Sequence, residues 1–239
     1  FTEEQKALIL SAAERPEDVI FCLKSEMTDD LLRDADVILG NLENPGQLEK
    51  TGHLKWIQLN NAGTEGYCVP GRLPQGAVLT NATGAYGLAI SEHMLACLFM
   101  LRKKLNLYYA NQLRRQWKSE GHVGVIQGTT VLVIGLGDIG TCFASKMKAL
   151  GCTTIGVKRR VGEKPDCVDG LYGMEELDSL LPRADVVALS LPGNPSTYHT
   201  LNRERISLLS PNAIVLNVGR GTAVDTDLSL IHISEPTRP

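Results

Sequence analysis

The chain has 239 residues, of which 43% are hydrophobic, and a formal net charge of −3. This length and apolar content are enough for one or two hydrophobic cores. The slightly negative net charge gives no general basic surface, so nucleic acid is not expected as a partner. The six cysteines form no C-x-x-C pair, which suggests neither a zinc knuckle nor a redox dithiol and favours the reduced thiols of a cytoplasmic protein; no metal is expected.

The most apolar stretch, residues 85–101, is not expected to cross a membrane. Glu92 and His93 lie in its middle, and titratable groups at that depth of a bilayer are unfavourable. The first residues of the chain show no secretory signal pattern. We therefore expect a buried helix in a cytoplasmic protein with no membrane partner.

Residues 1–101 predict a small, open α/β domain of the flavodoxin-like kind. Short helices alternate with short apolar strands, which is typical of a sheet that packs against helices. Helices are expected at residues 3–13 and 28–33, and strands at 19–23, 37–39, 56–59 and 77–80. Because this pattern opens on a helix, we expect that the first strand of the domain is missing.

Residues 102–227 predict a second α/β domain with a parallel, doubly wound Rossmann sheet. Two helices, at 87–104 and 105–118, lead toward it. Its strands are expected at 131–135, 153–157, 186–190 and 213–217, with a weak one near 171–172. Since such a sheet normally has about six strands, we expect an incomplete domain with an uncovered apolar edge, which would make the chain poorly soluble or only partly folded.

A Gly-x-Gly-x-x-Gly motif follows the first strand of this second domain. Gly135 would allow the tight turn, Gly137 the close approach of a pyrophosphate, and Gly140 the packing of the next helix against the strand. Such a motif also occurs in purely structural turns. The helix predicted at 138–150 and the strand after it favour a dinucleotide site, with Asp138 and Ile139 at the start of that helix as further candidates.

Basic residues stand at the position that distinguishes NAD from NADP. An acidic residue at the end of the second strand would bind the ribose 2′-hydroxyl group of NAD. Lys158, Arg159 and Arg160 occupy this place instead, and guanidinium groups suit a 2′-phosphate. We therefore expect NADP(H) as the cofactor. The alternative is a solvated basic loop in a protein that accepts either NAD or NADP.

Two further strand ends are expected to flank the cofactor, because ligands bind at the carboxyl ends of parallel strands. Leu191 and Pro192 follow the strand at 186–190, and Val218 and Gly219 follow the strand at 213–217. An ordinary strand-ending turn explains the first pair without any ligand.

Taken together, these segments resemble the D-isomer-specific 2-hydroxyacid dehydrogenases. The matching segments cover most of residues 1–227 and are Asn61-Ala62-Gly63-Thr64-Glu65, Ser91-Glu92-His93, the glycine motif 135–140, Ser190-Leu191-Pro192 and Asn217-Val218-Gly219-Arg220-Gly221. The resemblance implies that residues 1–101 form the substrate domain. It also implies hydride transfer between NAD(P)H and a 2-oxo acid or D-2-hydroxy acid, as in a glyoxylate or hydroxypyruvate reductase, within a homodimer.

The same resemblance implies roles for three residues. The backbone N–H groups of Ala62 and Gly63 would bind the substrate carboxylate, and Arg220 would bind the carboxylate and keto oxygen. A fixed guanidinium would stabilise the negative charge that develops on that oxygen. The alternative is that Arg220 is an ordinary polar residue beyond a strand.

The catalytic His and Glu that the resemblance implies would follow Arg220 by several tens of residues, but only nineteen residues remain. No other histidine is a convincing proton donor; His93 fits a structural role. Residues 228–239 resemble a translated sequencing adapter, so this non-native tail, with His232 and Glu235, is given no function. We expect the chain to be inactive alone.

Two other functions stay open. One is a non-catalytic, dinucleotide-sensing protein on the same scaffold, similar to the corepressors that resemble this family. The other is a related dehydrogenase that acts on formate or phosphite. The sequence does not show the volume of the substrate pocket, so it does not decide which 2-oxo acid would be used.

Overall fold

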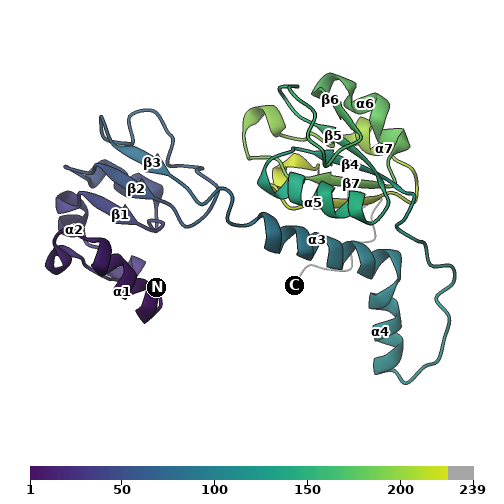
Figure 1. Ribbon diagram of the computed structural model, residues 1–239, viewed down its shortest axis with the longest axis horizontal. Coiled ribbons are helices and arrows are strands. Elements are labelled where there is room, and N and C mark those ends of the chain that lie inside the picture. The colour runs from purple at the N-terminus through teal and green to yellow at the C-terminus, as the bar shows by residue number, and fades with distance from the viewer. Residues whose placement is uncertain (226–239) are drawn as a thin grey trace. The chain divides into compact units, whose positions relative to one another are not determined.

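The computed structural model describes residues 1–225 of the chain. These residues form two compact units, which we call the first unit (Phe1–Ala82) and the second unit (from Thr83 onward). Figure 1 shows both as α/β structures. The expected non-native tail, residues 228–239, lies outside the described residues.

The first unit contains a small parallel sheet. Its strands are β1 (Val37–Leu39), β2 (Trp56–Gln58) and β3 (Val78–Thr80), in the order β1-β2-β3. All three were predicted from the sequence. Ile38, Ile57 and Leu79 are register partners across the sheet and project toward the same face.

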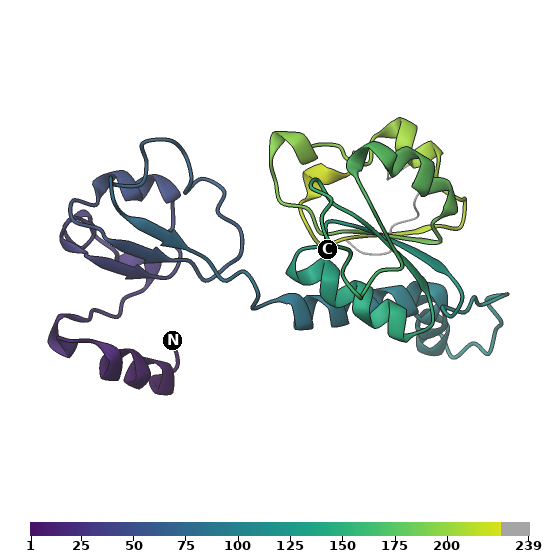
Figure 2. The same ribbon diagram turned by 45° about the horizontal axis from the view of Figure 1, so that its top comes forward.

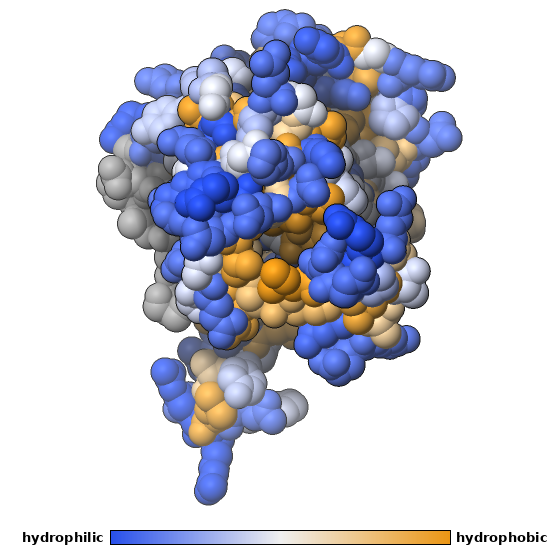
Figure 3. Space-filling model, turned by 90° about the vertical axis from the view of Figure 1, so that its left-hand side faces the viewer, coloured by the Kyte–Doolittle hydropathy of each residue, from blue (hydrophilic) through white to orange (hydrophobic). Residues whose placement is uncertain are grey.

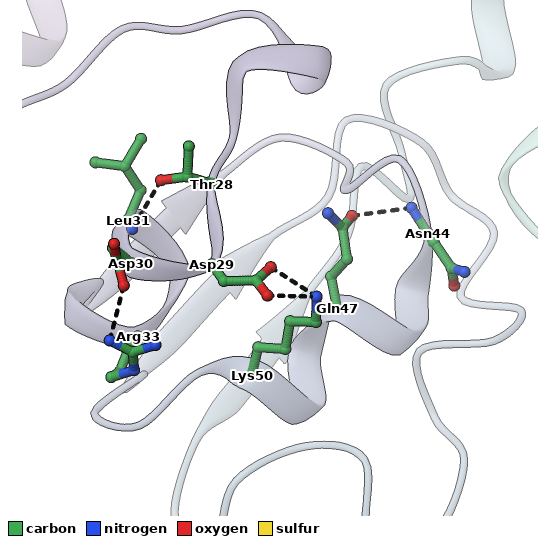
Figure 4. Close-up of polar contacts among 8 residues, drawn as sticks. All are labelled: Thr28, Asp29, Asp30, Leu31, Arg33, Asn44, Gln47 and Lys50. Carbon is green, nitrogen blue, oxygen red and sulfur yellow. Dashed lines mark hydrogen bonds and ion pairs between the residues drawn. The ribbon is translucent and has the colours of Figure 1, made fainter.

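Helix α2 (Asp29–Asp34) and the 3₁₀ helix η3 (Pro45–Lys50) cover that face. Before them in the chain lie α1 (Glu3–Ala12), which has no buried residue, and the 3₁₀ helices η1 (Pro16–Asp18) and η2 (Lys24–Glu26). Both expected α-helices are confirmed, and Thr28 caps α2 by accepting a hydrogen bond from Leu31 N. Lys50 Nζ lies 2.6 Å from Asp29 Oδ1 and ties η3 to α2 (Figure 4).

The core of the first unit lies on one side of the sheet only. Leu32 of α2 and Leu48 of η3 pack there against Ile57 of β2, and all three are fully buried. The opposite face leaves Val37 and Val78 exposed. The surface of this unit therefore carries apolar areas between charged ones (Figure 3).

The strand expected at residues 19–23 is absent. This segment has no regular structure and lies between η1 and η2, with Ile20 and Leu23 exposed. A strand requires a hydrogen-bonding partner along its length. In a flavodoxin-like sheet the second strand pairs with the first and not with the third. The prediction was wrong because periodicity alone does not supply a partner, and within the described residues β1 pairs only with β2.

The second unit contains a five-stranded parallel sheet in the order β6-β5-β4-β7-β8. This is the Rossmann order 3-2-1-4-5, so the predicted fold class is confirmed. The strands are β4 (Thr130–Ile134), β5 (Thr153–Val157), β6 (Gly170–Tyr172), β7 (Val186–Leu189) and β8 (Ile214–Asn217). All five lie within a residue or two of their predicted positions.

Helices cover both faces of this sheet (Figures 1 and 2). On one face α3 (Gly87–Arg102) and α5 (Asp138–Ala149) bury Val131 and Val133, while on the other face Leu132 and Ile134 are buried. That second face packs against α6 (Leu177–Leu180), η5 (Leu181–Arg183) and α7 (Arg203–Ser207), with η4 (Met174–Glu176), η6 (Pro195–Thr197) and η7 (Gly221–Ala223) in the connections. Burial on both faces explains why β4 is apolar along its whole length.

The boundary between the units differs from the one expected at residue 101. The division falls at Ala82–Thr83, so α3 belongs to the second unit. Its buried residues Gly87, Ser91, Met94 and Leu98 follow a helical spacing, and the helix packs against α5. Hydrophobic packing, rather than order along the chain, therefore assigns this helix to the second unit.

The helix expected at 105–118 is shorter than predicted. It is α4 (Leu105–Leu113), which ends where Arg115 adopts a left-handed φ of 56°. The chain then returns toward α4, and Asn111 Nδ2 donates a hydrogen bond to Glu120 Oε1 at 2.6 Å. Local helix propensity does not predict this contact, because the two residues are nine positions apart in the sequence.

In residues 1–225 no helix combines the length and apolar character that a bilayer crossing requires. The six cysteines are free thiols, and two of them, Cys152 and Cys167, are buried. No group of three or more His, Cys, Asp or Glu side chains in this part of the chain is arranged to hold a metal ion.

Candidate functional site

The glycine turn lies at the carboxyl end of β4, the strand at which the sheet changes its direction of winding. Gly135 has a φ of 95°, a conformation that favours glycine. A Cβ atom at this residue would come within 2.8 Å of Ser190 O. The turn therefore requires glycine here for both conformation and space.

Gly140 and Gly137 have different surroundings within the same turn. A Cβ atom on Gly140 would collide with Gly135 O and lie 2.7 Å from Ser190 Oγ. A Cβ atom on Gly137 would meet nothing within 4 Å, and this residue is exposed. Gly140 thus serves the packing of α5, whereas Gly137 leaves open backbone at the place where a phosphate group would approach.

The amino-terminal end of α5 faces this turn. Gly137 is the N-cap residue, and Asp138 is the first residue of the helix. The first N–H groups of a helix and its dipole favour an anion. The Asp138 carboxylate lies so close to Gly87, at the start of α3, that a Cβ atom there would collide with Asp138 Oδ1. The Asp138 side chain therefore packs against the start of α3.

Ser190, expected with Leu191 and Pro192 at a strand end beside the cofactor, also ties two loops of the site together. Its hydroxyl group donates a 2.6 Å hydrogen bond to Gly135 O, and its N–H group donates to Ile134 O at 3.0 Å. Both bonds tie the end of β7 to the turn after β4. The residue type gave no signal for this role, because the partner lies 55 positions away in the sequence.

The ends of β7 and β8 meet beside the turn. Val218 N donates a hydrogen bond to Leu189 O at 3.0 Å. A Cβ atom on Gly219 would lie 2.5 Å from Leu191 O and 2.7 Å from Leu191 N, so glycine allows the two loops to touch. Pro192 follows and accepts a hydrogen bond from Thr197 Oγ1 at 2.6 Å. These predicted cofactor residues thus lie together at one edge of the sheet.

The three basic residues 158–160 follow β5 directly. Lys158 is half-buried, and its N–H group donates to Tyr172 O at 3.1 Å, whereas Arg159 and Arg160 are exposed. Within residues 1–225, none of these three side chains forms an ion pair or side-chain hydrogen bond. No side chain of residues 1–225 therefore neutralises their charges.

Arg220 follows β8 in a loop that Asn217 fixes from both sides. Asn217 Nδ2 donates to Arg220 O at 2.9 Å, and Asn217 Oδ1 accepts from Gly219 N at 3.1 Å. The Arg220 side chain is exposed and lies beside its own loop, where Nη1 donates to Gly219 O at 3.2 Å. Asn217 is thus a second residue that holds the site; the sequence places it in a matching segment but does not predict this role.

Ala62 and Gly63 follow β2 in the first unit. Ala62 is exposed and Gly63 is half-buried. Among the described residues, no group accepts a hydrogen bond from the N–H of either residue. Two successive N–H groups without protein partners are suited to bind an anion.

Among the histidines of residues 1–225, none forms a hydrogen bond to a carboxylate beside Arg220. His93 is exposed, and its Nε2 lies 3.5 Å from Cys97 Sγ. His199 stacks on Tyr198, and its Nδ1 lies 3.8 Å from Asp225 Oδ2, beyond hydrogen-bond distance. His232 and Glu235, which were given no function, lie outside the described residues.

The largest resolved pKa change in the second unit lies away from these loops. Asp169, just before β6, accepts hydrogen bonds from the backbone N–H and hydroxyl of Thr154 and pairs with Lys148 of α5. The backbone hydrogen bond, followed by Lys148, lowers the pKa of Asp169 to about 2. This carboxylate anchors β5 to α5.

A comparison with protein families gives a match to the NAD binding domain of D-isomer specific 2-hydroxyacid dehydrogenase over residues 95–234. Among curated proteins, a D-3-phosphoglycerate dehydrogenase from Methanocaldococcus jannaschii is 28% identical over 198 residues, which is 81% of this chain and 38% of that protein. A glyoxylate reductase from Thermococcus onnurineus is 33% identical over 162 residues, which is 63% of this chain and 45% of that protein. The chain thus spans less than half the length of either relative.

Solved structures give the same result for the fold. A D-isomer specific 2-hydroxyacid dehydrogenase family protein from Aeromonas salmonicida is 30% identical, with a TM-score of 0.81 over 95% of this chain and 73% of that chain. A D-lactate dehydrogenase from Aquifex aeolicus, complexed with NAD and lactic acid, is 24% identical, with a TM-score of 0.78 over 95% of this chain and 69% of that chain.

Proposed function

We propose that this chain, which belongs to the D-isomer specific 2-hydroxyacid dehydrogenase family, forms part of a cytoplasmic oxidoreductase. Its reaction would transfer a hydride between NAD(P)H and a 2-oxo acid, as in a glyoxylate or hydroxypyruvate reductase. One observation carries this proposal: the glycine turn, the loops after β7 and β8, and Arg220 all lie at the carboxyl edge of one Rossmann sheet. Ligands of such sheets bind at this edge.

The residues present fit a dinucleotide. Gly135 and Gly140 have no space for a side chain, which is the packing that a pyrophosphate turn requires, and Gly137 leaves open backbone beside the helix start. The N–H groups at the start of α5 would hold the pyrophosphate, and the loop around Leu191 would pack beside the adenosine half. When bound, the nicotinamide supplies or accepts the hydride.

We infer that NADP(H) is preferred over NAD(H). The support is the set of three cationic side chains after β5, none of which has an acidic partner within residues 1–225. Arg159 and Arg160 are exposed, so they would bind a 2′-phosphate at little cost in lost internal contacts. Structures in the wider fold include complexes with NAD and with NADPH, so fold alone does not decide the cofactor.

Arg220 is the residue to which we assign the catalytic role. Its guanidinium would bind the 2-oxo acid carboxylate and stabilise the charge that develops on the keto oxygen, more strongly in the transition state than in the ground state. Asn217 holds the Arg220 backbone, so the start of the side chain is fixed before substrate binds. Ala62 and Gly63 would offer their N–H groups to the carboxylate.

Steady-state oxidation of NADPH with glyoxylate or hydroxypyruvate tests this function. Because the family resemblance implies a catalytic His and Glu several tens of residues after Arg220, turnover is measured on the full-length protein. Arg220→Lys should lower kcat/KM at least about 100-fold, since an ammonium group lacks the parallel donors of a guanidinium. Arg203→Lys, at the exposed start of α7, is the matched control and should leave kcat/KM unchanged. Equal activity of the two variants would rule out the proposed role of Arg220.

We also infer a homodimer that forms through α4 and the segment after it. Large apolar side chains are exposed there, including Tyr109, Leu113 and a fully exposed Trp117. Such side chains on one projecting segment are typical of an interface. Replacing Leu113 and Trp117 with Ser should convert the species seen in sedimentation velocity from dimer to monomer. A monomeric wild-type protein would contradict this inference.

A further inference from the structure

Asparagine side chains that follow all three strands of the first unit surround the backbone of residues 60–63. Asn41 comes shortly after β1, and Asn81 comes directly after β3, while residues 60–63 follow β2 between them. Because parallel strands end at the same edge of a sheet, these side chains lie at one end of the unit. Both Asn41 and Asn81 are half-buried.

Asn41 holds the loop from the β1 side through both ends of its amide group. Its Oδ1 accepts a 2.8 Å hydrogen bond from Asn60 N, and its Nδ2 donates a 2.8 Å hydrogen bond to Asn61 Oδ1. The preceding residue, Gly40, has a φ of 126° and donates its N–H to Gln58 O at 2.8 Å. That glycine conformation places Asn41 beyond the end of β2.

Asn81 holds the same loop from the β3 side. Its Nδ2 donates a 2.7 Å hydrogen bond to Ala62 O. The next residue, Ala82, donates its N–H to Asn61 O at 3.0 Å. The carbonyl groups of residues 61 and 62 are therefore both engaged, and the peptide planes that carry the N–H groups of Ala62 and Gly63 are fixed, because each peptide group is planar.

We propose that Asn41 and Asn81 are positioning residues that orient the N–H groups of Ala62 and Gly63 toward a bound carboxylate. The inference rests on the proposed function, in which that carboxylate belongs to the 2-oxo acid. Hydrogen bonds to Asn61 O and Ala62 O fix the carbonyl side of the two peptide groups. The N–H groups on their other side, those of Ala62 and Gly63, have no acceptor in residues 1–225. Ordering the loop before binding removes part of the entropic penalty of association.

The experiment uses the 239-residue chain with either Asn41→Ala or Asn81→Ala. The first readout is the heteronuclear NOE of the Ala62 and Gly63 amides without ligand, which should fall in both variants as the loop loses order. The second is a titration with oxamate, an unreactive analogue of a 2-oxo acid, followed through the same amides. Each variant should bind oxamate about fivefold more weakly, the effect of losing about one hydrogen bond, with NADPH affinity unchanged.

Asn44→Ala is the matched control. Asn44 Oδ1 accepts a 2.8 Å hydrogen bond from Gly46 N in the same unit, and this cap does not touch residues 60–63. The control should keep wild-type loop order and oxamate affinity. Wild-type order and affinity in both Asn41→Ala and Asn81→Ala would overturn the proposal, as would an equal loss in Asn44→Ala. Loss of order in the two variants, together with no binding of oxamate by the wild-type chain, would support the positioning role and contradict the proposed substrate instead.

Discussion

The two units use sheets of the same parallel kind but bury them to different extents. In the first unit, strands of three residues have one covered face, and Val37 and Val78 stay exposed on the other. In the second unit, β4 and its neighbours are buried on both faces between two layers of helices. Buried apolar area is the main favourable term in folding. The candidate cofactor loops therefore stand on a well-buried scaffold, whereas the loop at Ala62 depends on side-chain hydrogen bonds.

The largest expected effect comes from removing core side chains, one in each unit. Phe143→Ala leaves a cavity in the core of the second unit, and Leu48→Ala leaves one in the core of the first unit. Each substitution should lower the unfolding free energy by about 3 kcal/mol. Because the first unit buries less, Leu48→Ala should separate its unfolding from that of the second unit in a calorimetric scan. A single transition that shifts equally in both variants would contradict the difference between the units.

A smaller but more specific effect concerns the glycine turn. Gly140→Ala places a methyl group against Gly135 O, so it should destabilise the second unit by about 2 kcal/mol and remove measurable NADPH binding. A Cβ atom on Gly137 would meet open space, so Gly137→Ala should change the unfolding free energy by less than about 0.5 kcal/mol and still weaken NADPH binding. Chemical denaturation and fluorescence titration measure the two quantities. If Gly137→Ala left NADPH affinity unchanged, this turn would not be the pyrophosphate site.

The acid stability of the second unit should depend on Asp169. Hydrogen bonds and Lys148 lower its pKa to about 2 in the folded state, below the value of about 3.9 for an unfolded chain. Its contribution is therefore present above pH ~4 and is lost as the pH falls from ~4 toward ~2. Because the pair is partly exposed, Asp169→Asn should cost only about 1 kcal/mol at neutral pH. The variant's stability should converge with that of the wild type in acid; a constant difference between pH ~6 and ~2 would contradict this assignment.

The smallest effect is expected for an exposed ion pair of the first unit. Lys50 and Asp29 are in contact at 2.6 Å, but both side chains are about half exposed. Lys50→Met should change unfolding free energy by less than about 0.5 kcal/mol and lose even that in high salt. A loss of more than about 1 kcal/mol in unfolding free energy would show that surface ion pairs add substantially to the stability of the first unit, whose core covers only one face of its sheet.

Local patterns sufficed where neighbouring residues decide the structure. The apolar run at β4, the glycine turn and the start of α5 were predicted closely, since strand, turn and helix signals follow one another within a few residues. The strand expected at 19–23 was wrong, because its formation depends on a partner strand and not on its own composition. Helix α4 ended early for a similar reason: Asn111 contacts Glu120 after the chain turns back.

In the candidate site, too, the sequence predicted the residues that follow a local pattern and missed the roles that depend on contacts between distant residues. The glycines and the basic residues 158–160 were found from spacing alone, and the structure brings the loops after β4, β7 and β8 to one edge. Asn41 was not predicted, and Ser190 and Asn217 were predicted only as members of strand-end segments, because the hydrogen bonds through which these residues act follow no spacing rule. Asn41, for example, reaches a residue 20 positions away.

The most direct test of the central claim is equilibrium titration of the 239-residue chain with NADPH and with NADH. We expect NADPH to bind more tightly than NADH. Replacing Arg159 and Arg160 with Ala should weaken the affinity for NADPH by at least about tenfold and change the affinity for NADH by less than about twofold. Failure of both dinucleotides to bind would contradict the assignment of the glycine turn. Equal losses for NADPH and NADH in the double variant would contradict the 2′-phosphate role of the basic residues.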